Sequence, residues 1–143
     1  MYDDADPLLG RLRQVASRFP ESVEVEAWGR PTFRAGRKIF AVYGASQDHP
    51  HAVVFKPDPD ERPALLGDPR FVVPPYFGPG GWLALDLDAD DVDWAEVDEL
   101  LDSSFRQVAL VRMLRALDAH DGARGPQDAS VAPRRSTDRE VPR

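Results

Sequence analysis

The sequence predicts an α+β fold, in which an antiparallel sheet of about five to six strands packs against N-terminal and C-terminal helices. Three observations predict this fold. Apolar residues recur at helical spacing near both ends of residues 1–118, short apolar segments lie between them, and tight turns separate those segments. Strands that follow one another through tight turns pair antiparallel, and residues 1–118 have the size of a single domain.

The first element is a helix from about Asp6 to Phe19, in which Asp6 caps the first turn and Pro7 takes the first helical position. Its apolar residues follow helical spacing and form one stripe that we expect to be buried: Leu8, Leu12, Val15, Ala16 and Phe19. Pro20 ends this helix, since its ring fits poorly beyond the first turn.

Four strands are predicted next. In residues 22–28 apolar and polar side chains alternate, which places Val23, Val25 and Ala27 on one face of a half-buried strand. Residues 31–34 and 38–43 form a hairpin around Gly36, which can adopt the positive φ that a tight turn needs. Residues 51–56 form the fourth strand.

The second half predicts a short helix within residues 58–67, a short strand near residue 71, a Pro/Gly-rich loop and a strand over residues 82–87. The last helix begins at a capping box, Asp93 with Glu96, and continues to about Leu117. The following residues lack apolar periodicity and are rich in Gly, Pro, Ser and Arg. Residues 119–143 are therefore predicted to be a disordered C-terminal tail.

Composition restricts the function. The chain has no Cys, which excludes disulfides, thiolate metal sites and cysteine nucleophiles. It has no apolar segment long enough to span a membrane and no secretory signal, so we expect a cytoplasmic protein without a membrane partner. A net charge of -7 argues against binding nucleic acid with the whole surface, because such binding depends on phosphate neutralisation.

No catalytic or metal-binding pattern is complete. In an EF-hand loop counted from Asp86, the sixth position is Asp91 instead of Gly and the twelfth is Val97 instead of Glu. His49 and His51 lack a third ligand nearby, and the glycine-rich residues 78–81 precede a strand rather than a helix. We therefore predict no catalytic residue, no metal and no cofactor, which argues against an enzyme.

Two groups of residues remain as candidate binding sites. The first is basic, and it lies in a segment without acidic residues from Ala27 to Gln47: Arg30, Arg34, Arg37 and Lys38. Charged hairpin tips often serve solubility alone, so from the residues either role stays open. The second group is aromatic and is a candidate ligand site or a core cap: Trp28, Tyr76, Phe77 and Trp82.

The order of several blocks resembles the MmcQ/YjbR family of small bacterial proteins. The blocks are "GRPTFRAGRKIFA" (residues 29–41), "VVFK" (53–56), "PPYFGPGGWLALDLD" (74–88) and "SSFRQVALVR" (103–112). The positions that match the family are Gly29, Pro31, Phe33, Arg34, Lys38, Phe40, Ala41, Tyr76, Trp82, Asp86, Leu87, Ser104, Phe105 and Val108.

The resemblance implies an α+β fold likened to a double-wing DNA-binding architecture and to the frataxin-like fold. It also implies a nucleic-acid-binding protein that is not an enzyme, in which the hairpin wing meets phosphates through Arg34, Arg37 and Lys38, with Arg30 beside them. Such binding is expected to be weak and largely independent of sequence. The alternative is a module that binds a small molecule or a protein partner with the loop around Tyr76 and Trp82.

Overall fold

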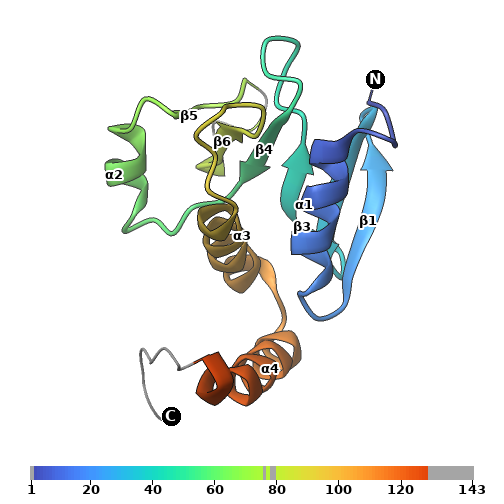
Figure 1. Cartoon of the computed structure of the whole chain (residues 1–143), viewed down its shortest axis with the longest axis vertical. Coiled ribbons are helices and arrows are strands. Elements are labelled where there is room, and N and C mark those ends of the chain that lie inside the picture. The colour runs from blue at the N-terminus through green and yellow to red at the C-terminus, as the bar shows by residue number, and fades with distance from the viewer. Residues whose placement is uncertain (1, 76, 78–79, 129–143) are drawn as a thin grey trace. The chain divides into compact units, whose positions relative to one another are not determined.

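A computed structural model describes residues 2–75, 77 and 80–128, and for residues 122–128 it describes the backbone alone. The chain divides into two compact units, residues 1–109 and residues 110–143, and each is described by itself. The first unit has the predicted α+β fold (Figure 1). Its elements in chain order are α1 (Pro7–Ser17), β1 (Ser22–Ala27), β2 (Arg30–Ala35), β3 (Lys38–Tyr43), β4 (Ala52–Phe55), α2 (Arg62–Leu66), β5 (Phe71–Val72), β6 (Leu83–Asp86) and α3 (Trp94–Val108).

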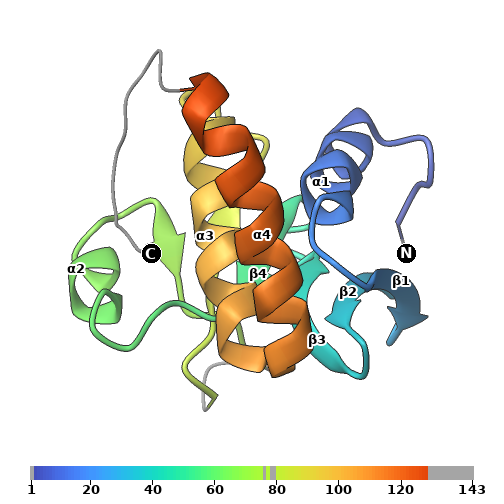
Figure 2. The same ribbon diagram turned by 90° about the horizontal axis from the view of Figure 1, so that it is seen from below.

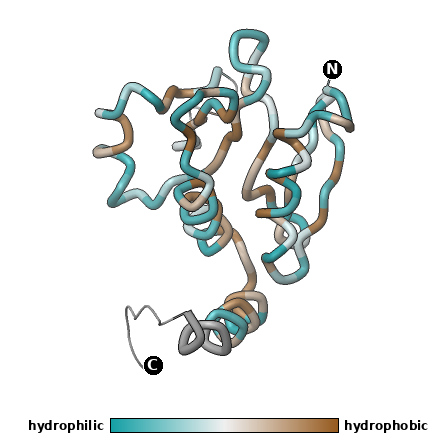
Figure 3. The backbone as a smooth tube through the Cα atoms, in the orientation of Figure 1, coloured by the Kyte–Doolittle hydropathy of each residue, from teal (hydrophilic) through white to brown (hydrophobic). Residues whose placement is uncertain are grey.

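The six strands form one antiparallel sheet in the order β1-β2-β3-β4-β6-β5. The first four strands are neighbours in sequence and in space because tight turns or one short loop join them. β6 then pairs with β4 and leaves β5 at the far edge. Figure 3 shows hydrophobic stretches along the central strands and a hydrophilic loop between β3 and β4.

α1 begins as predicted. The Asp6 carboxylate accepts a hydrogen bond from the backbone N–H of Leu8 at 2.9 Å, and Pro7 follows it. The buried stripe differs from the prediction at two positions, because Leu9 is fully buried in place of Leu8, and Leu8 and Val15 are only half buried. Leu12, Ala16 and Phe19 are buried, as expected.

α1 and α3 cover one face of the sheet (Figures 1 and 2). Three aromatic rings join them at the centre of this face: Phe19 stacks on Phe105 at a centroid distance of 4.9 Å, and Phe40 meets both rings edge-on. Arg18 at the end of α1 pairs with Asp98 and Asp102 of α3. These ion pairs hold the two helices together.

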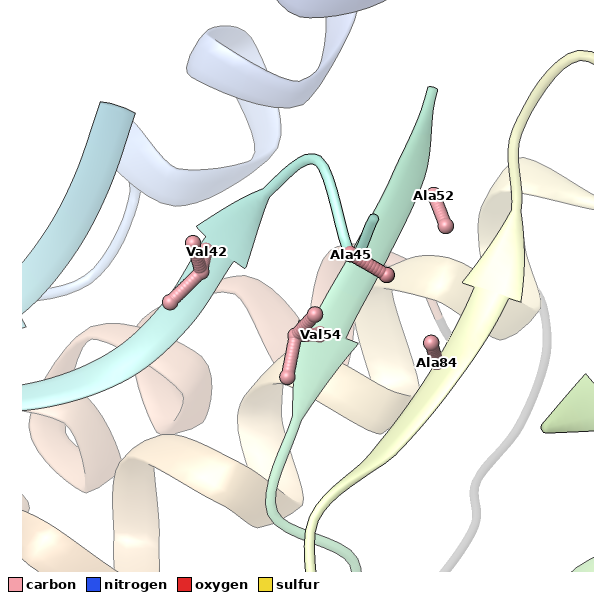
Figure 4. Packing of buried hydrophobic residues seen from close by; sticks show 5 residues of the cluster. All are labelled: Val42, Ala45, Ala52, Val54 and Ala84. Atoms are coloured by element: carbon pink, nitrogen blue, oxygen red, sulfur yellow. The ribbon is translucent and has the colours of Figure 1, made fainter. Parts of the chain in front are cut away.

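The opposite face of the sheet carries a second, smaller cluster. Its fully buried members come from β3, β4, β6 and the β3–β4 loop: Val42, Ala45, Ala52, Val54 and Ala84 (Figure 4). Phe77 and Trp82 pack against this cluster from the loop that precedes β6. The loop therefore acts as a cover for small side chains.

The prediction that β1 is half-buried was wrong, because none of its six residues is buried. Val23 and Val25 remain 47% and 40% exposed, because β1 is an edge strand and this part of the sheet face lies beyond the cover just described. The other face of β1 meets α1, where Glu24 accepts hydrogen bonds from Arg13 at 2.8 Å. Alternation correctly indicated a strand, but it does not show that both faces of this edge strand stay largely open to solvent.

The C-terminal helix also differs from its prediction. Asp93 caps α3 through the backbone N–H of Ala95, as expected, but α3 ends at Val108, where Ala109 adopts an extended backbone. A separate helix, α4 (Val111–Asp128), belongs to the second unit. No Pro or Gly in residues 105–114 marks this break.

α4 continues past Asp118, where the sequence places the start of the tail. Residues 129–143 lie outside the described residues, so the disordered tail over residues 119–143 stays a prediction there. Among the described helices, none combines the length and apolar character that crossing a bilayer would require.

Candidate functional site

The basic hairpin consists of β2, β3 and the turn between them, with the cations Arg34, Arg37 and Lys38. Ala35 pairs with Lys38, and Gly36 takes a φ of 65°, so the turn forms where the sequence predicts it. Arg37 and Lys38 are exposed at this tip. Arg34 is half buried, and its Nε donates to the hydroxyl of Thr32 at 3.0 Å. The three cations therefore lie at one end of the hairpin.

The acidic residues of β1 do not neutralise this end. Arg34 lies opposite Val23 and Ile39, so its side chain belongs to the sheet face away from α1 and α3. Glu24 and Glu26 belong to the helix-covered face, where Glu24 pairs with Arg13. Over the described part of the chain, Arg34, Arg37 and Lys38 form no ion pair.

Arg30 does not join the other three cations. It begins β2, next to the β1–β2 turn, and Ala27 is its partner in the register. The hairpin tip lies at the other end of the same strand, which spans six residues. A strand of that length extends roughly 20 Å, so one ligand group cannot bridge both ends.

The aromatic group is divided in the same way. Phe77 and Trp82 lie 6.2 Å apart between ring centroids and pack on the Val42 cluster, which fits a core cap. Trp28 instead occupies the β1–β2 turn and is 70% exposed. Tyr76 lies outside the described residues, so its proposed place in a ligand site is untested.

A cleft of about 720 Å³ lies beside Trp28, between the N-terminal segment, the β1–β2 turn and the β3–β4 loop. We call it the Trp28 cleft. Its volume falls within the range of about 300–1,000 Å³ that is typical of small-molecule sites. The residues that matter for its chemistry are Tyr2, Asp3, Asp6, Trp28, Tyr43 and His51.

A polar network forms one wall of the cleft. The hydroxyl of Tyr43 lies 2.5 Å from Asp6 Oδ2 and 2.8 Å from His51 Nδ1, and Asp6 Oδ2 lies 3.3 Å from the same nitrogen. An ionised carboxylate only accepts hydrogen bonds, so Tyr43 donates its one proton to Asp6. The Nδ1 of His51 must then donate to this pair, which leaves Nε2 as a hydrogen-bond acceptor in the neutral ring.

The network changes the acidity of two of its members. Burial raises the pKa of the Tyr43 phenol far above its usual value, and the hydrogen bond to Asp6 raises it further. Burial opposes ionisation of Asp6. Hydrogen bonds from Tyr43 and from the Leu8 N–H, together with nearby His51, nevertheless hold the pKa of Asp6 below its usual value. Asp6 is therefore a carboxylate and Tyr43 a neutral phenol near neutral pH.

Sequence reasoning did not identify this network. The sequence predicts Asp6 as a helix cap, places His51 in an incomplete metal-ligand pattern and makes Tyr43 the last residue of a strand. Asp6 and Tyr43 are separated by 37 positions, and no spacing pattern connects them. Their meeting depends on how α1 crosses the sheet. In the part of the chain that the structure describes, no cluster of three or more His, Asp or Glu side chains is arranged to hold a metal ion.

The comparisons with known proteins bear on family alone. No curated protein sequence matches the chain at a significant level. The family model described as YjbR matches residues 17–107, which contain all six strands and α2 together with most of α3. That match covers more than half of the chain, so this protein belongs to the YjbR family.

Proposed function

We propose that this protein binds nucleic acid weakly through the basic hairpin, where Arg34, Arg37 and Lys38 contact phosphates. One observation carries the proposal: these three cations have no carboxylate partner over the described residues. Arginine and lysine side chains that hold no counter-ion are the groups that phosphate recruits. Family membership is compatible with this function and does not decide it.

The arrangement of charge supports the proposal despite the net charge of -7. Several other arginines are committed to carboxylates, as Arg18 is to Asp98 and Arg70 is to Asp68 and Glu96. The acidic side chains of β1 face the helix side of the sheet, away from Arg34. A local positive tip on an acidic protein can steer a polyanion to one orientation.

The number of contacts sets the strength of binding. Three phosphate contacts to duplex DNA give a slope of about -2.7 for the logarithm of the association constant against the logarithm of salt concentration. A fourfold rise in salt then weakens binding by roughly 40-fold. Sequence preference is expected to be small, since no side chain of this set is proposed to read a base edge.

Fluorescence anisotropy with a labelled DNA duplex at low salt tests the proposal. The double variant Arg37→Gln with Lys38→Gln changes two exposed side chains and leaves Arg34, which bonds to Thr32, in place. We expect its affinity to fall at least fivefold and its salt slope to become shallower by about 1.8.

A charge-matched control separates local contact from bulk charge. Arg11→Gln with Arg115→Gln removes two exposed cations from α1 and α4 and gives the same net charge. This control is expected to bind like the wild type. Equal losses in the two double variants, or no binding by the wild type at low salt, would overturn the proposal.

A further inference from the structure

We propose that the Trp28 cleft binds a small organic cation, whose ammonium group lies against the aromatic side chains and is paired with carboxylates of the wall. The residues that carry this proposal are Tyr2, Asp3, Asp6, Trp28 and His51. The site is separate from the basic hairpin, because the β1–β2 turn and the hairpin tip lie at opposite ends of β2. Its existence does not depend on nucleic-acid binding.

Trp28 has a conformation that stability does not explain. It adopts a φ of 56° and is followed by Gly29 with a φ of 73°, which makes a two-residue turn of the type that favours Asn-Gly. A bulky residue in this left-handed region is strained by on the order of 1 kcal/mol. At 70% exposure, the indole gains little from burial in return. An exposed and strained aromatic at the rim of a cleft is better explained by ligand contact.

The charge of the cleft favours a cation. Asp3 and Asp6 line it, and Arg30, the cationic residue in the lining, already has an interaction within the protein. More distant carboxylates add to the field, because Asp86 and Asp88 both help to raise the pKa of Tyr43. An anionic ligand would meet two carboxylates directly, whereas an ammonium group would neutralise them.

The hydrogen-bonding groups agree with the charge. Asp3 and Asp6 offer carboxylate oxygens, and the tautomer that Tyr43 and Asp6 impose on His51 leaves Nε2 as a further acceptor. The cleft therefore presents acceptors to a ligand that supplies donors. The aromatic faces of Tyr2 and Trp28 provide cation–π contact, which with acidic neighbours is a common way to recognise ammonium groups.

Titration of the ¹⁵N-labelled full chain with choline tests the proposal by NMR. We expect millimolar choline to shift the indole N–H of Trp28 and the amides of residues 44–49 and His51. The neutral isostere 3,3-dimethyl-1-butanol has the same shape without the charge and is expected to bind at least tenfold more weakly. A parallel titration with n-butylammonium shows whether a primary ammonium, which can donate to His51 and Asp3, is preferred.

Matched variants separate a specific site from general attraction. Asp3→Asn and Asp60→Asn each remove one exposed negative charge, but only Asp3 lines the cleft. We expect Asp3→Asn to weaken choline binding at least threefold and Asp60→Asn to leave it unchanged. Trp28→Asn suits the turn conformation, so this variant should fold and yet bind at least tenfold more weakly.

Three results would overturn the proposal. The first is equal binding of choline and its neutral isostere, since the charge would then play no part. The second is an equal loss in the Asp3 and Asp60 variants. The third is the absence of shifts at Trp28, residues 44–49 and His51 with both ammonium probes.

Discussion

The hydroxyl of Ser104 in α3 donates a hydrogen bond to the backbone carbonyl of Phe40 in β3 at 2.6 Å. Phe40 is the extra residue of a β-bulge, because its neighbours Ile39 and Ala41 pair with the adjacent residues Arg34 and Phe33 of β2. On its other side, β3 pairs with β4 only as far as Ala41 and Phe55, so Ser104 gives the Phe40 carbonyl a partner just beyond the end of that ladder.

Removing the Ser104 hydroxyl is therefore expected to lower the stability of the protein measurably. Its oxygen also accepts from the backbone N–H of Lys56, just after β4, and the side chain is fully buried. Ser104→Ala removes both bonds and is expected to cost about 2–3 kcal/mol in the free energy of unfolding, measured with urea. Ser103→Ala, next to it on α3 and half buried, is the control and should change stability by less than about 0.5 kcal/mol. Similar losses in both variants would contradict this role.

Replacement by Ala is expected to have opposite effects on stability at two glycines, Gly10 and Gly44. Gly10 lies inside α1 with no atom within 4 Å of an added Cβ, so Gly10→Ala is expected to stabilise the protein by about 0.5–1 kcal/mol. Gly44 has a φ of 96°, and an added Cβ would lie 3.4 Å from the carbonyl oxygen of Pro50. Gly44→Ala should therefore lower the melting temperature, while Gly10→Ala raises it. Changes of the same sign would show that one of these backbone interpretations fails.

Replacing Trp28 by a residue suited to its turn is expected to increase the stability of the protein. Trp28→Asn is expected to raise the free energy of unfolding by about 0.5–1 kcal/mol, because Asn tolerates positive φ. Trp28→Val, which places a β-branched residue at the same φ, should be destabilising. Thermal denaturation of both variants checks the pair. Destabilisation by Asn would instead mean that the indole contributes packing despite its exposure.

The lowered pKa of Asp6 is expected to make the stability of the protein depend on pH. Its pKa is lower in the folded protein than the ordinary value of 3.8, so the folded state binds its proton less readily than the unfolded chain does. The stability that Asp6 contributes is present above this ordinary value and is lost as the pH falls through the folded pKa. Asp6→Asn keeps a capping oxygen and is expected to flatten the decline in unfolding free energy between about pH 5 and 2.

The control for the Asp6 measurement is Asp60→Asn, which removes an exposed carboxylate that lies outside the lining of the cleft. Urea denaturation at several pH values gives the slopes. Parallel slopes for the wild type and Asp6→Asn would mean that the contacts of Asp6 with Tyr43 and His51 do not favour its ionised form.

Local patterns predicted most elements because their causes are local. Asp6 and Asp93 cap helices through side-chain oxygens a few atoms from the backbone they serve, and Gly36 makes its turn within four residues. The class of the fold follows from such elements in order. The family resemblance, by contrast, includes two residues that meet across a long sequence separation, since Phe40 and Ser104 are among the matching positions.

Other predictions failed where a distant residue decided the outcome. Alternation in β1 assigned Val23 and Val25 to the buried face, but Arg13 of α1 draws Glu24 to the helix side and leaves the valines at an uncovered edge. The sequence predicts the basic residues as one group, whereas the length of β2 separates Arg30 from Arg37 and Lys38. A run of residues in sequence does not show which of them a strand keeps together.

The sequence by itself determined the α+β class, the caps, the turn at Gly36 and the family, because each depends on neighbouring residues or on their order. Only the tertiary structure decided which cations remain without carboxylate partners in the described chain, and which side chains surround the Trp28 cleft. Asp6, Tyr43 and His51 meet because the N-terminus of α1 lies beside the end of β3 and the start of β4. Such contacts depend on how helices and strands pack, and short-range patterns carry no information about that packing.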